Sequence, residues 1–280
     1  MNKIDPRRSD GELGHLLRHW RKLRGKSQIA LSLDTGVSQR HLSFIESGRS
    51  APGKQTLVHI AQVLNVPLKD RNQLLLAAGF APIYPDDAWN AREMDSVTRA
   101  LTRVLHHHEP YPAVVMDRYW NVLMTNESAP RFFSSFIDFG TRPKPRNILH
   151  LMFDPAGMRP FIANWPSASR GLIERIHREA VGSFTDEKTR ELISALLAYP
   201  CADSDVMMAD RMESEPTLPV IPLSFKKDGR VLNYFSMVST VGTPQTIAAQ
   251  ELRVECMFPM DEMTEAYHHE LMDTARSPNE

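Results

Sequence analysis

The chain has few cysteines: only Cys201 and Cys256 occur in 280 residues, far apart and without the paired spacing of a zinc site. A disulfide scaffold or a structural zinc site is therefore not expected, and both thiols are interpreted as small buried side chains. No apolar run reaches the roughly 18 to 20 residues of a membrane span, and no basic segment followed by an apolar one opens the sequence. We expect a cytoplasmic protein that does not contact membranes.

Signatures of catalysis are missing as well. The sequence has no G-x-S-x-G elbow, no P-loop and no G-x-G-x-x-G turn. The run His106-His107-His108-Glu109 is a poor metal site, because adjacent residues on a helix point about 100° apart. We therefore expect neither enzyme activity nor a cofactor.

Charge is distributed unevenly, although the formal net charge is only −1. Residues 1–84 carry 13 Lys and Arg against 6 Asp and Glu, whereas residues 85–280 carry 20 against 28. Basic side chains gain affinity for polyanions by displacing counterions from phosphates, so only the first part is expected to bind nucleic acid. The stretch GFAPIYPDDAW at 79–89 is typical of a linker. We predict two domains, 1–84 and 85–280.

Five helical patterns fill the first domain, which is predicted to be all-α. The second pattern follows Ser27 and ends at Gly36, and the third follows Ser38. Serine before a helix caps its N-terminus, and glycine after a helix adopts the left-handed conformation that ends it. The short turn between the two patterns predicts a helix-turn-helix. We expect Ile29, Ala30 and Leu33 of the second helix to face inward.

The third helix is predicted to read DNA bases. Leu42 and Ile45 would lie on its inner side, leaving an outer face with Gln39 and Arg40 in the first turn. Gln pairs bidentately with adenine in the major groove, and Arg with guanine. Basic residues in the flanking turns, and a Gln at a helix N-terminus, are suited to phosphates. The predicted DNA-binding residues are Lys26, Gln28, Ser38, Gln39, Arg40, Ser43, Phe44, Arg49 and Lys54.

The words SQ, TGVSQ and IESG at 27–28, 35–39 and 45–48 resemble the helix-turn-helix of the phage-repressor and Cro superfamily, specifically the xenobiotic-response-element (XRE) type of bacterial regulator. The resemblance implies DNA-facing positions at Gln28, Gln39, Arg40, Ser43 and Phe44. Phe44 departs from the polar residue usual at its position, and either touches a thymine methyl group or covers a neighbouring helix. Glu46 and Gly48 are interpreted as structural residues that close the helix end.

The second domain is predicted to mix α and β structure. A strand hairpin comes first, and Asn126 is suited to cap the helix that follows it. Helical spacing occupies the middle, and strands return near the end. The strand-like runs are 112–126, which holds two, then 220–225, 230–241 and 249–258. This order allows a roughly five-stranded antiparallel sheet, covered on one face by helices, with a pocket between them.

Longer words in this half are LLLAAGFAPIY, EPYPAVVMDRYWNVLMTN, LHLMFDPAGMRPFIANW, LNYFSMVSTVGTPQ and ELRVECMFP. They resemble PAS-like sensor domains, and more closely the ligand-binding domain of MmyB-type regulators, which joins directly to this kind of helix-turn-helix. With the DNA-binding part, the resemblance covers roughly residues 10–265. It implies a ligand-responsive transcription factor whose second domain binds a fatty-acid-like apolar molecule.

Fourteen methionines provide flexible thioethers that adapt to an alkyl chain, although core filling explains them equally well. Polar candidates for a head group also have structural interpretations: Asn126 as a cap, His150 as a hydrogen-bonded core residue and Arg170 as a solvated helix residue. Trp120 and Trp165 are equally consistent with packing. The predicted ligand-binding residues are Met116, Trp120, Met124, Asn126, His150, Met152, Asn164, Trp165, Arg170, Met237 and Met257.

Two functions are consistent with the sequence. The first is a homodimeric bacterial regulator that binds a double-stranded operator with an inverted repeat and responds to an apolar, fatty-acid-like effector. The second is a DNA-binding regulator whose second domain is purely structural and serves dimerisation or protein docking.

Overall fold

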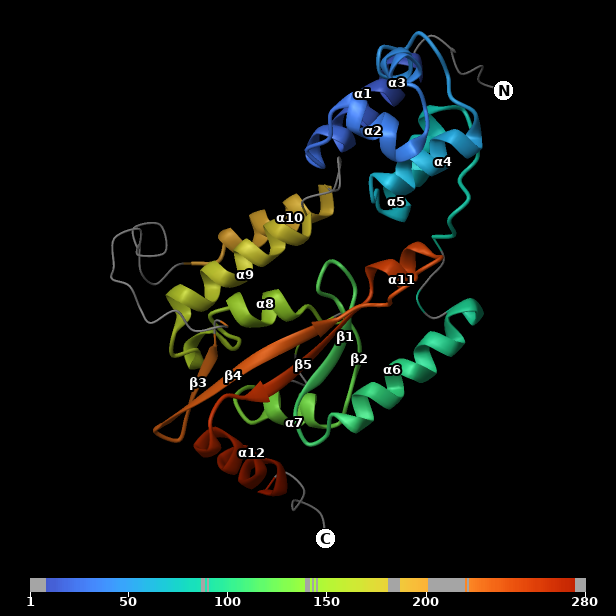
Figure 1. Ribbon diagram of the computed structural model, residues 1–280. Helices are drawn as coiled ribbons and strands as arrows, with labels where there is room; N and C mark the ends of the chain where they lie inside the picture. The colour runs from blue at the N-terminus through green and yellow to red at the C-terminus, as the bar shows by residue number, and fades with distance from the viewer. Residues whose placement is uncertain are drawn as a thin grey trace. The chain divides into compact units, whose positions relative to one another are not determined.

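The computed structural model describes residues 9–86, 89, 91–138, 142, 144, 146–180, 187–200, 220 and 222–274. The chain falls into two compact units. Figure 1 shows the helices and strands, with a colour that runs along the chain by residue number. The first contains Met1–Ala88 and also Thr243–Gln250, whereas most other residues form the second. Within the first unit, Leu68 N donates a hydrogen bond to Gln250 Oε1 at 2.7 Å. The predicted division into 1–84 and 85–280 did not include Thr243–Gln250 in the first unit.

Five helices form the part of the first unit that precedes residue 85, as predicted. They are α1 (Ser9–Leu23), α2 (Gln28–Thr35), α3 (Gln39–Glu46), α4 (Lys54–Val63) and α5 (Leu68–Ala77). Trp20 from α1, Leu31 from α2 and Ile45 from α3 are each at most 2% exposed and meet in one apolar core. This shared core fixes the orientation of α3.

The inward positions of α2 differ from the prediction. Ile29 is 58% exposed and Leu33 81% exposed, while Leu31 and Thr35 are buried. The Thr35 hydroxyl donates to Leu31 O at 2.6 Å, so this polar side chain is satisfied within its own helix. In a helix of eight residues either set has helical spacing, and contacts with other helices decide which set is buried.

A five-stranded antiparallel sheet lies at the centre of the second unit, as predicted. Its order is β2-β1-β5-β4-β3. The first hairpin adds an edge, and the last three strands complete the sheet. The strands are β1 (Ala113–Met116), β2 (Val122–Thr125), β3 (Leu223–Lys227), β4 (Arg230–Ser239) and β5 (Arg253–Pro259).

Helices of the second unit surround this sheet, and Figure 1 shows α8 and α9 on the side opposite α6. Consistent with that view, His108 at the end of α6 lies edge-on against Phe258, with ring centroids 4.7 Å apart. The elements are η2 (Arg92–Met94), α6 (Asp95–His107), α7 (Ser128–Ser134), α8 (Ile148–Phe153), η3 (Arg159–Phe161), α9 (Trp165–Ala180), α10 (Glu187–Leu197) and α12 (Glu262–Thr274). Helix α11 (Ile247–Glu251) belongs, except for its last residue, to the late segment of the first unit.

The expected strand 249–258 begins too early. Its first residues belong to α11, where the Thr246 hydroxyl oxygen accepts a hydrogen bond from Ala249 N at 3.2 Å. Alanine, glutamine and glutamate are good helix formers, which favours this short helix before β5. Helix α12 follows β5 and was not expected; Asp261 caps it by accepting from Thr264 N at 2.7 Å.

Candidate functional sites

The turn between α2 and α3 has the predicted local chemistry. Ser27 Oγ accepts a hydrogen bond from Ala30 N at 3.0 Å, and Ser38 Oγ accepts from His41 N at 3.2 Å. Gly36 ends α2 with a φ of +68°, in the left-handed region that favours glycine. These local contacts place α3 directly after a tight turn.

Helix α3 has one buried side and one open side. Leu42 and Ile45 are 2% and 1% exposed, as predicted. Gln39 and Arg40 are exposed at the start of the helix, and Ser43 is half-buried one turn later. The open side therefore presents long hydrogen-bonding side chains, as a helix in the major groove requires.

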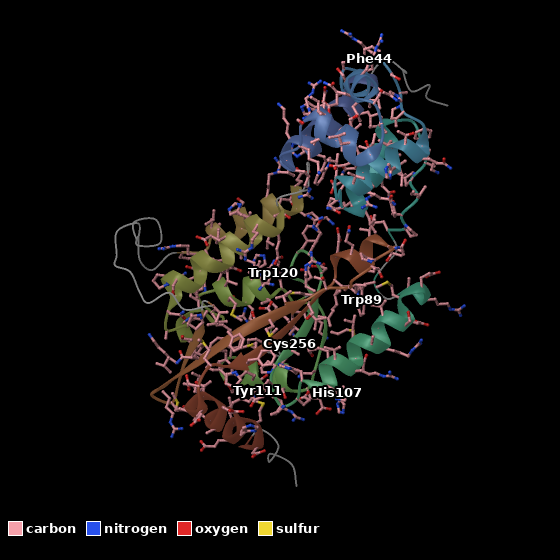
Figure 2. All side chains as sticks on the ribbon, viewed as in Figure 1. Phe44, Trp89, His107, Tyr111, Trp120 and Cys256 are labelled. Carbon is pink, nitrogen blue, oxygen red and sulfur yellow. The ribbon has the colours of Figure 1, made fainter. Side chains whose placement is uncertain are left out.

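Phe44 lies at the surface of the first unit (Figure 2), where its ring contacts two arginines. The Arg40 guanidinium carbon lies 5.4 Å from the ring centroid, and that of Arg49 lies 5.9 Å from it. Cation–π attraction of this kind restricts flexible side chains. Both sequence interpretations of Phe44 omitted this contact, which links a predicted base reader to a predicted phosphate contact.

A buried ion-pair cluster fastens the end of α3. Arg21 Nε and Nη2 donate to the two Glu46 oxygens at 2.5 and 2.9 Å, and Gln28 Nε2 donates to Glu46 Oε2 at 3.0 Å. Burial alone would raise the pKa of Glu46, but these hydrogen bonds and the charges of Arg21 and Arg18 hold that pKa below its ordinary value. Glu46 is thus structural, as interpreted, and it also orients Gln28.

The other predicted phosphate contacts surround this helix. Lys26 Nζ lies 2.5 Å from Asp34 Oδ2 in a partly exposed ion pair. Lys54 is exposed and begins α4, and Arg49 is exposed after α3. Gly48, with a φ of +72°, separates the helix end from Arg49. Basic groups therefore flank the open side of α3.

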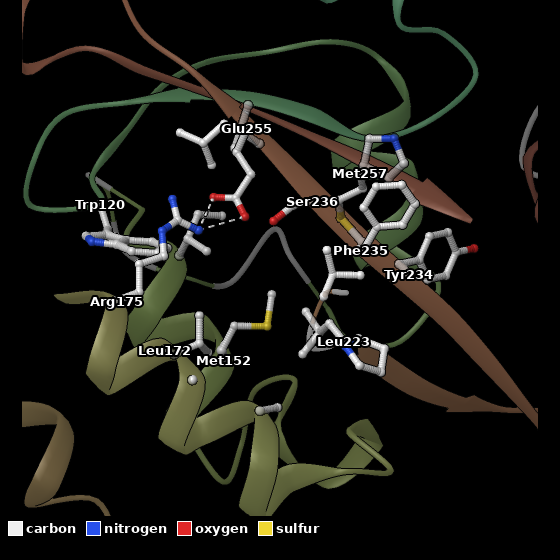
Figure 3. A pocket seen from close by; sticks show the side chains of 18 of the residues that line it. Trp120, Met152, Leu172, Arg175, Leu223, Tyr234, Phe235, Ser236, Glu255 and Met257 are labelled. Atoms are coloured by element: carbon white, nitrogen blue, oxygen red, sulfur yellow. Dashed lines mark hydrogen bonds and ion pairs between the residues drawn. The ribbon is translucent and has the colours of Figure 1, made fainter. Parts of the chain in front are cut away.

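A cavity of about 610 Å³ lies in the second unit between the sheet and helices α8 and α9 (Figure 3). Most of its wall is apolar, with Leu172 and Met152 from the helices facing Met257 and Val114 from the strands. Pockets for small molecules occupy about 300 to 1,000 Å³ and combine an apolar wall with a few polar groups. The cavity fits that description.

The polar end of the cavity is built around Arg175 of α9. Its Nε lies 2.8 Å from Glu179 Oε1, and its Nη1 lies 3.2 and 3.3 Å from the two Glu255 oxygens. Burial lowers the pKa of Arg175, but the two carboxylates raise it by more, so the guanidinium stays charged. The Nη2 atom is buried and has no hydrogen-bond partner among the described residues.

The indole ring of Trp120 packs against the guanidinium of Arg175. The Arg175 guanidinium carbon lies 4.2 Å from the indole ring centroid. Trp120 has a φ of +66°, which is an uncommon and strained conformation for a bulky residue. Asp117 stabilises the turn by accepting from Tyr119 N and Asn121 N at 2.8 and 3.0 Å. The strained turn directs the indole into the cavity.

Three predicted ligand-binding residues, Trp120, Met152 and Met257, line the cavity. Met237 does not belong to its described lining and is 59% exposed. The reason is strand alternation: Ser236 and Val238 of β4 face the cavity, so Met237 points to the opposite face of the sheet.

The predicted polar anchors make contacts within the protein instead. Asn126 Oδ1 accepts from Ala113 N at 3.0 Å and from Ala129 N at 3.1 Å, as a cap would. His150 Nδ1 lies 2.9 Å from the Tyr199 hydroxyl. Asn164 Nδ2 donates to Pro222 O at 2.7 Å. The described cavity lining includes none of these predicted residues: Met116, Met124, Asn126, His150, Asn164, Trp165, Arg170 and Met237.

The remaining predicted residues are either packed elsewhere or exposed. Met116 is 1% exposed in the core, and Met124 is half-buried in β2. Trp165 packs edge-on against Phe153, with centroids 4.9 Å apart. Arg170 is exposed on α9. Sequence reasoning chose Arg170 and missed Arg175, although the apolar spacing of Ala168, Leu172 and Ile176 indicates which side of α9 faces the sheet.

The described ranges contain neither a membrane-spanning helix nor a cluster of metal-binding side chains. No helix there is long and apolar enough to cross a membrane. Nor does that part of the chain bring together three or more His, Cys, Asp or Glu side chains in a way that would hold a metal ion.

Two family models match separate stretches of the chain. A helix-turn-helix family model matches residues 17–70, and the MmyB-like transcription regulator ligand binding domain matches residues 97–271. None of the curated proteins matches the chain. The matches confirm both resemblances and indicate a ligand-responsive transcription regulator. The chain belongs to the family of MmyB-like transcription regulators, with an XRE/Cro-like helix-turn-helix ahead of its ligand-binding domain.

Proposed function

We propose that the chain binds its operator as a homodimer, and that an alkyl-chain amphiphile similar to a fatty acid occupies the cavity and changes operator affinity. The cavity of about 610 Å³, apolar except around Arg175, is the observation that carries this proposal. Its methionine and leucine walls suit a flexible chain, and its charged end suits a polar head. A ligand can change operator affinity only by binding two arrangements of the regulator with unequal affinity.

The helix-turn-helix of the first unit is the reason for proposing a homodimer. A single helix-turn-helix reads about half of an operator, and dimers of such units bind half-sites about 34 Å apart or a multiple of that. Two copies related by a twofold axis therefore match an inverted repeat.

Filling the cavity is expected to abolish stabilisation by lipid. Saturating tetradecanoic acid or tetradecanamide should raise the free energy of unfolding of the full chain by about 2.7 kcal/mol at a hundredfold excess over Kd. The melting temperature should rise as a result. Leu172→Trp, which adds volume to the α9 wall of the cavity, should remove the response (Figure 3). Met237→Trp is the matched control, because Met237 is 59% exposed and should leave the response intact. Differential scanning calorimetry of both variants measures the difference.

Operator binding then tests the regulatory part. Affinity is measured with and without the stabilising lipid, at one salt concentration. Stabilisation without any change in operator affinity would leave a ligand site but remove the proposed regulation. No stabilisation by either lipid would count against an alkyl-chain effector altogether.

Arg40→Ala and Lys54→Ala are expected to weaken DNA binding in different ways. Loss of Arg40 should cost about 1 to 3 kcal/mol at one base pair in each half-site and relax the base preference there. Loss of Lys54 should weaken all sequences alike and reduce the salt dependence by about one counterion per contact. Titrations against operator variants measure both effects. If Arg40→Ala kept the parent's preference at every position, its base-reading role would be wrong.

A further inference from the structure

The ring of Phe44, on helix α3, lies against two basic side chains. Arg40 precedes Phe44 by four residues, which places both side chains on one side of the helix. The Arg40 guanidinium carbon is 5.4 Å from the ring centroid. Arg49 reaches the same ring from the turn after the helix, with its guanidinium carbon 5.9 Å from the centroid. One ring therefore serves a side chain from the start of α3 and another from beyond its end.

The turn after α3 is tied to the backbone of Phe44. Arg49 N donates a hydrogen bond to Phe44 O at 2.8 Å, and Ser50 N donates to the same oxygen at 3.3 Å. Gly48, with a φ of +72°, lets the chain reverse at this point. Because of these bonds, the Arg49 backbone stays close to Phe44, and its side chain reaches the ring without help from distant residues.

Neither of these arginines has an ion pair with a carboxylate among the described residues. Residues 13–69 contain just two acidic residues, and each pairs with another basic group: Asp34 with Lys26, and Glu46 with Arg21. A carboxylate would cancel the charge of a guanidinium and occupy its N–H groups, whereas an aromatic face attracts the cation and leaves both available. The two arginines are thus restrained, yet their charge remains free for DNA.

We propose that Phe44 is a positioning residue for base recognition, whose ring holds the Arg40 guanidinium ready for its base without itself contacting DNA. The inference rests on the proposed base reading by Arg40. Ordering a long, flexible side chain at an interface lowers affinity, because rotamer freedom is lost. That loss arises only at the base pair to which Arg40 bonds. A ring that restrains the side chain beforehand therefore strengthens the preference for that base pair.

The test uses the full-length protein and a double-stranded operator selected with the parent protein from a random-sequence library. Arg40→Ala first identifies the base pair that Arg40 reads. Phe44→Leu removes the ring but keeps an apolar side chain, and we expect it to lower the preference at that base pair about fivefold. In the Arg40→Ala background, Phe44→Leu should lower no base preference further. Phe44→Tyr is the matched control, because it keeps the ring and should keep the preference.

A second comparison separates positioning from direct contact with thymine. Deoxyuridine in place of every thymine removes the methyl groups that an apolar side chain could touch in the major groove. The loss of affinity caused by Phe44→Leu should be equally large on the two operators, because the ring acts through Arg40. If that loss disappeared on the deoxyuridine operator, Phe44 would contact a thymine methyl group, and the positioning role would be wrong.

The remaining outcomes also decide the matter. An Arg40→Ala protein that kept every base preference would remove the proposed base reading, and this inference with it. Unchanged preference in Phe44→Leu, or an equal loss in Phe44→Tyr, would overturn the inference and leave the base reading by Arg40 standing. Should calorimetry show that Phe44→Leu is unfolded, Phe44→Met also lacks the ring and must meet the same expectations.

Discussion

Replacing Glu46 by alanine is expected to lower the free energy of unfolding of the first unit by about 3 to 5 kcal/mol, because it leaves buried charge without a partner. The Glu46 side chain is 4% exposed and its partner Arg21 is 11% exposed. Hydrogen bonds from Arg21 and Gln28 bring α1 and α2 to the end of α3 through this one carboxylate. Urea unfolding of the full chain, followed by circular dichroism, measures the loss.

Asp34→Ala is the matched control for this effect. Asp34 also pairs with a basic residue, but its side chain is 41% exposed and that of Lys26 is 31% exposed. Exposed pairs contribute about 0 to 1 kcal/mol, so this variant should unfold almost as the parent does. Equal losses in the two variants would contradict the role assigned to burial.

Because of Glu46, the free energy of unfolding of the first unit should depend on pH. The pKa of Glu46 is lower in the folded protein than its ordinary value of 4.5. Its ionised form therefore stabilises the fold fully above about pH 4.5, and this contribution is lost as the pH falls through the lower folded pKa. Glu46→Gln cannot titrate, so the difference in stability between parent and variant should shrink as the pH falls in that range.

Local chemistry made the helix-turn-helix predictable. Ser27, Gly36 and Ser38 act within three or four residues of their own position, so the sequence alone indicates where α2 ends and α3 begins. The buried set of α2 was not predictable in this way. Ile29 and Leu33 match helical spacing as well as Leu31 and Thr35 do, and only the packing of five helices distinguishes them.

In the cavity, too, features set by neighbouring residues could be predicted, whereas features set by contacts far apart in the sequence could not. The strand at β4 was predicted, but whether Met237 or its neighbours face the helices depends on the register with β5, where Met237 pairs with Cys256. Arg175 sits on a helix among other charged residues, where solvation is the ordinary expectation. Its partner Glu255 lies 80 residues away, so no local pattern could connect them.

Gly14→Ala is expected to destabilise the first unit and weaken operator binding, whereas Gly11→Ala in the same helix should stabilise it. A Cβ at Gly14 would lie 2.5 Å from Glu46 O and 2.9 Å from Ile45 O, both backbone atoms of α3. No rotamer change removes such a clash, so α1 and α3 must move apart, at a cost of about 1 to 3 kcal/mol or more.

Gly11 supplies the comparison, because a Cβ there meets nothing within 4 Å. Alanine is favoured over glycine in a helix by about 0.5 to 1 kcal/mol, so the two substitutions should have opposite signs. The operator affinity of Gly14→Ala should fall as well, since the backbone it displaces belongs to the helix that carries Arg40. Thermal unfolding and operator titration of both variants measure these effects. Stabilisation by both substitutions would show that α1 does not fix α3 through this close approach.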